Sequence, residues 1–104
     1  MPLSGGTLTG NLNFANASTG IRGITGTIGD NDFWRVVGGV TSTDSGYLEL
    51  ATGDGANEPI YVRQYNDKFT TIKRTATLLD GSGNTSFPGQ VTASSFQGML
   101  YRAG

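Results

Sequence analysis

Turn-forming residues divide this chain into short runs in which apolar and polar side chains alternate. No window of about 11 or more residues places apolar side chains at helical spacing, so helices are not expected. The runs are rich in Thr, Val, Ile, Tyr and Phe, which strands favour, and Gly, Asp, Asn and Ser separate them. The sequence therefore predicts an all-β fold, an antiparallel meander or small β-sandwich, with strands at 20–28, 33–40, 47–52, 60–65, 69–75, 77–79, 85–87 and 90–96.

The supply of large apolar side chains is small for a chain of this length. Leu, Ile, Val and Phe together number 23 of the 104 residues, close to the level of about one-fifth below which chains tend not to fold alone. The formal net charge is only -1, so the charge repulsion that is typical of disordered chains is missing. A thin core without strong repulsion favours burial that is shared between copies of the chain.

Two residue types that carry much of enzyme and metal chemistry are absent from the sequence. Without Cys, the chain has no disulfide, no thiolate metal ligand and no cysteine nucleophile. Without His, it lacks the usual general base near neutral pH and the commonest metal ligand. We therefore expect no cofactor, no metal site and no catalytic residue.

The distribution of charge and of apolar residues also bears on membranes and nucleic acids. Residues 1–6 contain no basic region and no apolar run, and no stretch approaches the ~20 apolar residues of a membrane span. The charges are balanced and the sequence pI is near 5.0, which leaves no basic patch for phosphate backbones. We expect neither membrane insertion nor nucleic-acid binding.

Four side chains are candidates for contact with a receptor or a glycan. In the predicted strand 60–65, a period of two places Tyr61, Arg63 and Tyr65 on one face and the aliphatic residues on the other. Aromatic rings stack on sugar rings and Arg donates several hydrogen bonds, and Trp34 could act in the same way. Cross-strand aromatic packing is the favoured explanation of the Tyr/Arg face, and a lone Trp in a small β domain is more often a core or interface anchor, so ligand contact is the alternative interpretation for all four residues.

Two thin segments flank the predicted meander and share a short repeat. Gly-Asn-x-x-Phe occurs at 10–14 and again at 83–87, and each copy opens a segment with few apolar residues. A single such strand cannot bury its apolar row, whereas three copies around one axis can, although an ordinary edge strand is the alternative. The sequence thus predicts fibrous segments at 1–19 and 81–104 around a central domain at 20–80. The candidates for a trimer core are Leu8, Leu12, Phe14, Phe87, Val91 and Phe96.

The beginning of the chain resembles a repeat of viral fibres. Residues 2–12 read PLSGGTLTGNL and resemble the repeat P-L-S-G-G-T-M-T-G-x-L/I found in long tail fibres of tailed bacteriophages and prophages. Residue 8 is Leu where the repeat often has Met, which is a conservative difference. Further segments are similar to a module of such fibres, so that the resemblance covers most of the chain: 32–35, 46–52, 58–65 and 74–89.

The resemblance implies a trimeric, β-structured fibre of the virion, made from chains synthesised in the cytoplasm of a bacterial host. The implied partners are other tail-fibre or baseplate proteins and, at the host surface, a polysaccharide or an outer-membrane protein. We therefore expect a structural shaft or receptor-binding segment that serves host attachment. Direct recognition of a host glycan by a carbohydrate-binding adhesin domain is the alternative function.

Polysaccharide cleavage by paired carboxylates is the enzymatic alternative, because some phage tailspikes carry it out. Six of the eight acids are Asp residues in or beside turns rich in Gly, Asn and Ser, where Asp bonds the local backbone. The segment 30–32 also resembles the start of a calcium loop, but it lacks the following Gly and the closing Glu. We therefore expect a non-enzymatic chain.

Overall fold

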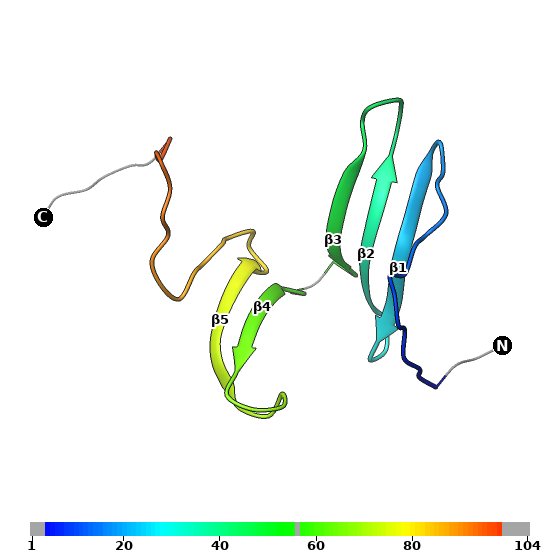
Figure 1. Ribbon diagram of the computed structural model, residues 1–104. Helices are drawn as coiled ribbons and strands as arrows, with labels where there is room; N and C mark the ends of the chain where they lie inside the picture. The colour runs from blue at the N-terminus through cyan, green and yellow to red at the C-terminus, as the bar shows by residue number, and fades with distance from the viewer. Residues whose placement is uncertain (1–3, 56, 99–104) are drawn as a thin grey trace, which may run out of the picture. The chain divides into compact units, whose positions relative to one another are not determined.

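The computed structural model describes residues 4–55 and 57–98, and every strand in this part of the chain is antiparallel to its neighbours. Three strands form one sheet in the order β1-β2-β3, and two strands form a second sheet (Figure 1). The described residues include no helix, and therefore none that could cross a membrane. The prediction of an all-β, antiparallel fold is confirmed. The strands are β1 Gly20–Ile28, β2 Asp32–Val40, β3 Tyr47–Gly53, β4 Ile60–Tyr65 and β5 Ile72–Leu79.

The chain divides into two compact units with one sheet in each. The first unit is Met1–Glu58 and the second is Pro59–Gly104. The division falls inside the predicted central domain, between β3 and β4. The predicted arrangement in three parts, 1–19, 20–80 and 81–104, concerns the assembled fibre and stays a prediction; residues 1–3 and 99–104 of its outer parts lie outside the described residues.

The strand boundaries follow the turn signals closely in the first four strands. β1 and β4 have the predicted bounds, while β2 begins one residue earlier and β3 ends one residue later than predicted. The predicted strands 69–75 and 77–79 are one continuous strand, β5, that begins only at Ile72. The prediction of a strand at 90–96 was wrong, and in the predicted strand 85–87 only Ser86 pairs, in an isolated bridge with Thr77.

The β1-β2-β3 sheet has two faces of different character. Its register pairs Ile24 with Val36 and Val36 with Leu50, which places these three side chains in one row across the sheet. We call the face that bears this row the apolar face, and the opposite face, which bears Arg35 and Glu49, the polar face. The remaining large apolar side chains of the apolar face are Ile28, Trp34, Val40 and Leu48, while Phe33 and Val37 lie on the polar face with Arg35.

Serine side chains close the turn between β2 and β3. Between β2 and β3, the backbone N–H of Ser42 donates to Oγ of Ser45 at 2.8 Å, and that hydroxyl donates to the carbonyl of Ser42 at 2.7 Å. Asp44 beside it has a φ of 64°, a left-handed conformation that Asp tolerates better than most residues. The Thr-Asp-Ser-Gly sequence thus forms the predicted turn through its side chains.

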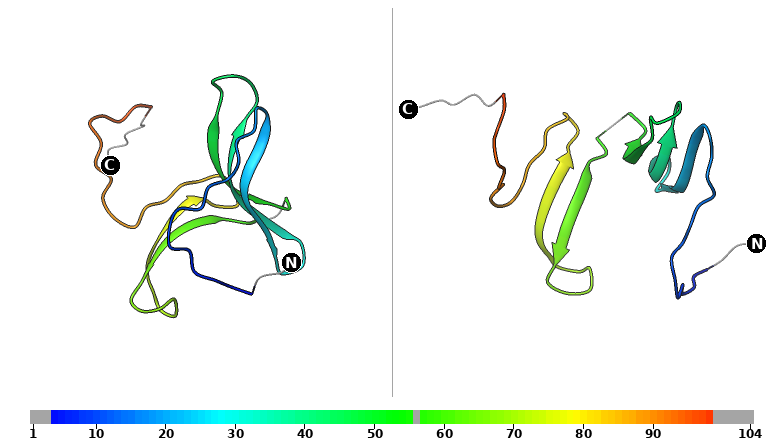
Figure 2. Two further views of the ribbon diagram at one scale, coloured as in Figure 1. Left: turned by 45° about the vertical axis from the view of Figure 1, so that its right-hand side comes forward. Right: turned by 45° about the horizontal axis from the view of Figure 1, so that its top comes forward.

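The β4–β5 hairpin turns through a longer loop than the sequence predicted. β4 and β5 run side by side in both views of Figure 2 and are joined by residues 66–71. The carboxylate of Asp67 accepts hydrogen bonds from the backbone N–H groups of Thr70 and Thr71, both at 3.0 Å. These bonds hold Phe69 in the loop with a φ of 67°, and its ring meets Tyr65 edge to face at 5.5 Å. The expected strand at 69–71 is therefore replaced by a turn.

A second aspartate organises the chain where it leaves β5. Oδ1 of Asp80 accepts from the backbone N–H groups of Ser82 at 2.8 Å and Asn84 at 2.9 Å. The turn returns the chain toward β5, where Ser86 and Thr77 exchange two backbone hydrogen bonds of 2.8 Å. The predicted turn at 80–83 is present, and backbone hydrogen bonds between Asp80 and Gly83 and between Asp80 and Asn84 hold it together with this carboxylate.

Because the carboxylates of Asp67 and Asp80 accept these hydrogen bonds, we expect the β4–β5 unit to lose stability in acid. Backbone hydrogen bonds from Thr71 and Thr70 lower the pKa of Asp67, and those from Asn84 and Ser82 lower the pKa of Asp80, below the usual 3.8. A lowered folded-state pKa means that the stabilisation is present above the unfolded-state pKa and is lost as the pH falls through the folded-state pKa. We expect the melting temperature to fall when the pH drops from about 6 to about 2.5.

The matched control is the double variant Asp67→Asn and Asp80→Asn. An amide oxygen can still accept the backbone hydrogen bonds but does not titrate, so the variant should lose less of its melting temperature in acid than the wild type. Circular dichroism at the two pH values measures both proteins. An equal loss in wild type and variant would assign the acid sensitivity to other carboxylates.

Candidate functional site

Few side chains are buried within a single copy of the chain. Among the described residues, Val37 is the only buried one, with 1% of its surface exposed. The register places Val37 between Gly23 of β1 and Glu49 of β3, in the middle strand of the first sheet. In the described part of one copy, the core therefore consists of little more than one valine, and many large apolar side chains keep 40% or more of their surface exposed.

The six predicted trimer-core residues all lie outside the strands and are exposed. Their exposed fractions run from 44% for Phe14 to 66% for Leu8. Their side chains are available to another copy of the chain, and their place in a trimer core stays a prediction. The six are Leu8, Leu12, Phe14, Phe87, Val91 and Phe96.

A second exposed apolar surface, which the sequence did not single out, lies on the first sheet. On the apolar face, Ile24, Val36 and Leu50 form a row across all three strands, and between 40% and 49% of each side chain is exposed. Neighbouring apolar side chains on one sheet face usually mark a surface that packs against something. Alternation in β1 and β3 indicated that one face of these strands is apolar. Only the register of the paired strands shows that Ile24, Val36 and Leu50 form one row.

The indole of Trp34 packs across the first sheet onto a glycine. A Cβ atom built at Gly26, the residue opposite in β1, would lie 2.4 Å from a ring carbon of Trp34. Only the absence of a side chain at position 26 lets the ring lie over the neighbouring strand. Trp34 is 40% exposed, so packing accounts for one side of its ring and a ligand role for the other side stays a prediction.

The second sheet brings together two of the other three candidate ligand residues. The guanidinium carbon of Arg63 lies 4.0 Å from the centre of the Tyr61 ring, and its Nε donates to the Thr75 hydroxyl at 3.2 Å. A register shift between Gln64 and Tyr65 interrupts the alternation, and Tyr65 is half-buried and packs against the turn. Trp34 belongs to the first compact unit, and Tyr61 and Arg63 belong to the second.

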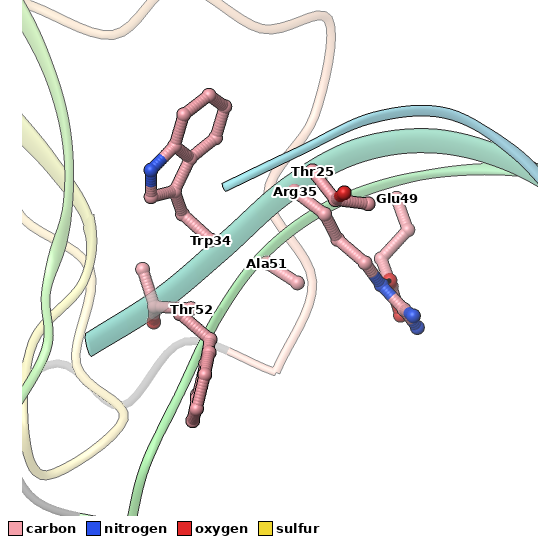
Figure 3. A pocket seen from close by; sticks show the side chains of 8 residues that line it. Thr25, Trp34, Arg35, Glu49, Ala51 and Thr52 are labelled. Atoms are coloured by element: carbon pink, nitrogen blue, oxygen red, sulfur yellow. Dashed lines mark hydrogen bonds and ion pairs between the residues drawn. The ribbon is translucent and has the colours of Figure 1, made fainter. Parts of the chain in front are cut away.

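The polar face of the first sheet carries an ion pair and a hollow (Figure 3). Nε of Arg35 on β2 donates to Oε1 of Glu49 on β3 at 2.5 Å, and this hydrogen bond raises the pKa of Arg35 above its usual value. Trp34 and Arg35 leave β2 in opposite directions in Figure 3, as neighbouring strand residues do. The hollow has a volume of about 490 Å³ and is lined by Thr25, Phe33, Trp34, Arg35, Glu49, Ala51, Thr52 and Gly53.

Three carboxylates meet beside this sheet. One carboxylate oxygen from each of Asp32, Asp54 and Glu58 lies within 4.8 Å of the other two. The sequence analysis considered Asp32 only as part of a calcium loop and missed this group, because Asp54 and Glu58 follow β3 and approach Asp32 only after the strands have paired. Exposed acidic groups of this kind are common in proteins without a bound cation.

The chain was compared with protein-family models, with curated proteins and with solved structures, and none of them matches it.

Proposed function

We propose that this chain is a structural segment of a bacteriophage tail fibre, acting as a homotrimer in the shaft or in the receptor-binding part of the virion. The observation that carries the proposal is the single buried side chain, Val37, in the described part of a chain with many exposed apolar residues. A solitary copy would gain little from hydrophobic burial, whereas copies that share their apolar surfaces would gain much more. The repeat-like sequence at 2–12 supports the same proposal.

The apolar face supplies one plausible contact between copies. Each residue of the Ile24, Val36 and Leu50 row already has about half of its surface covered, so burying the rest is worth about 1 kcal/mol per side chain. Three copies would multiply this gain, because a symmetric assembly repeats the same contact in every subunit. The exposed residues of the flanking segments would add to the shared core.

Open sheet edges support the same assembly. β1 and β3 are the outer strands of the first sheet, and the second sheet consists of two strands only. Outer strands present unpaired backbone groups that readily pair with another chain. In a fibre, such pairing between copies would give stiffness along the axis, which is the mechanical role that we propose between the tail or baseplate and the tip.

No catalytic role is part of this proposal. The carboxylates of Asp67 and Asp80 accept hydrogen bonds from the backbone of their own turns, as the sequence analysis expected of Asp residues in turns. These hydrogen bonds give Asp67 and Asp80 a structural role in their turns.

Direct binding of a host glycan or an outer-membrane protein is the second candidate function. Tyr61 and Arg63 favour it, because the ring and guanidinium stack together on the surface of the second sheet. The stack also fits plain cross-strand packing, since Arg63 donates to Thr75 on the neighbouring strand. Exposure of both residues in the assembled protein would separate the two interpretations.

Solution mass is the test of the trimer. We expect light scattering coupled to gel filtration to give three times the chain mass of 10.9 kDa, with no change on dilution. A mass of one chain at all concentrations would contradict the shared core and would leave the glycan-binding module as the better proposal.

A further inference from the structure

The hollow on the polar face combines an aromatic ring with a cross-strand ion pair. Phe33 and Arg35 are two residues apart on β2, so both side chains leave the strand on the polar face, and Phe33 is 51% exposed. Glu49 approaches Arg35 from β3. From this arrangement we propose that the hollow of Phe33, Arg35 and Glu49 binds a neutral hexopyranose unit of a polysaccharide.

Small residues on the neighbouring strands keep the hollow open. Gly53 lies opposite Phe33, and Ala51 lies opposite Arg35, both on β3. No large side chain of β3 therefore stands beside the phenyl ring, and the volume of about 490 Å³ lies within the range of ~300–1,000 Å³ that is usual for small-ligand sites. The apolar C–H face of a pyranose can stack on such a ring.

The ion pair provides hydrogen bonds for the hydroxyl groups of the sugar. A guanidinium has five N–H donors, and the contact with Glu49 uses the Nε donor of Arg35. The carboxylate of Glu49 has a second oxygen that can accept from a hydroxyl group. Thr25, which lies opposite Arg35 on β1, adds a hydroxyl to the lining.

The charge of the pair sets the class of the ligand. One cation and one anion in contact have no net charge, so the hollow has no reason to prefer a uronic acid or an amino sugar. A neutral ligand with many hydroxyl groups and one apolar face satisfies both the pair and the ring. A single sugar unit in such an open site is expected to bind with millimolar affinity, and a polysaccharide would gain strength from repeated contacts in a multimer.

This inference goes beyond the fibre role and does not depend on it. The three residues proposed to bind the sugar, Phe33, Arg35 and Glu49, lie on the polar face, whereas the proposed contact between copies uses the opposite face of the sheet. A sugar titration tests the hollow and the solution mass tests the trimer, so the two proposals can fail separately.

The test uses the full chain labelled with ¹⁵N and methyl glycosides of glucose, galactose and mannose as probes, with methyl glucuronide and glucosamine as charged comparators. We expect at least one neutral glycoside to shift the amide signals of Phe33, Arg35 and Glu49. Phe33→Leu, which removes the ring and keeps an apolar side chain, should weaken binding about tenfold. Phe69→Leu, the same substitution at an exposed ring in the loop between β4 and β5, should leave the affinity unchanged.

Glu49→Gln gives a second readout that does not depend on the ring. The substitution preserves the size of the side chain but leaves Arg35 with a net positive charge, so the preference should move from the neutral glycosides toward methyl glucuronide. The proposal is overturned if no neutral glycoside shifts these amides, if Phe33→Leu binds like the wild type, or if the wild type prefers a charged comparator.

Discussion

Replacing Gly23 with Ala should unfold the β1-β2-β3 sheet or lower its stability by about 3 kcal/mol. A Cβ atom at residue 23 would lie 2.4 Å from the carbonyl oxygen of Val36 and 2.8 Å from Cα of Val37. Both are backbone atoms of β2, so a change of side-chain rotamer cannot relieve the overlap, and the two strands must move apart. The same movement uncovers Val37, the only buried residue in the described part of the chain.

Gly38→Ala is the matched control for this substitution. Gly38 is also a strand glycine of the first sheet, but the nearest atom to its added Cβ is the carbonyl oxygen of Tyr47 at 3.8 Å, an ordinary contact. We expect its melting temperature to stay close to that of the wild type. Thermal denaturation at one protein concentration compares the three proteins, because assembly makes the melting temperature depend on concentration. Equal melting temperatures for both variants would contradict the predicted clash.

The strands of this chain were predictable wherever a turn has its own local signal. Gly29 has a φ of 65° and closes the β1–β2 hairpin, as the Gly-Asp-Asn sequence indicates. The first half of the loop at 66–71 was predicted as a turn, but residues 69–71 were not predictable from propensity, because Phe69 is a strand-favouring residue. The two hydrogen bonds to Asp67 outweigh this preference, and they involve residues three and four positions further along the chain.

The segment 90–96 shows a different limit of the sequence. Its alternating residues predicted a strand, but a strand requires a neighbour that completes its backbone hydrogen bonds. No described part of the same chain pairs with it. Alternation indicates that a segment can join a sheet, and it does not indicate whether the partner is the same chain or another copy.

Candidate residues were easier to predict than the surfaces that they form. Trp34, Tyr61 and Arg63 were recognisable from residue type alone, and alternation placed the last two on one face. The pairing of Arg35 with Glu49 depends on a register in which Arg35 faces Ala51, and no local pattern fixes that register. β2 also carries apolar residues on both faces, so its sequence does not reveal which face packs.

Replacing Val36 with Asp should separate the proposed trimer into single chains. Val36 is the middle residue of the apolar row and is 40% exposed in one copy, so the carboxylate can remain hydrated while the chain is alone. Contact between copies would bury that charge without a partner, which costs about 3 kcal/mol or more at each of three sites. Light scattering should give 10.9 kDa, with the β-sheet circular dichroism spectrum retained.

Two comparisons decide where the shared core lies. Thr25→Asp adds the same charge to the polar face of the neighbouring strand, where we expect the trimer mass to persist. Leu12→Asp and Phe96→Asp test the flanking segments that the sequence predicted as the core. If these two variants dissociate while Val36→Asp remains trimeric, the chains meet along the flanks and the apolar face has another partner. If Val36→Asp dissociates, the sheet itself forms the contact, because a charge at its centre acts only where that face is covered.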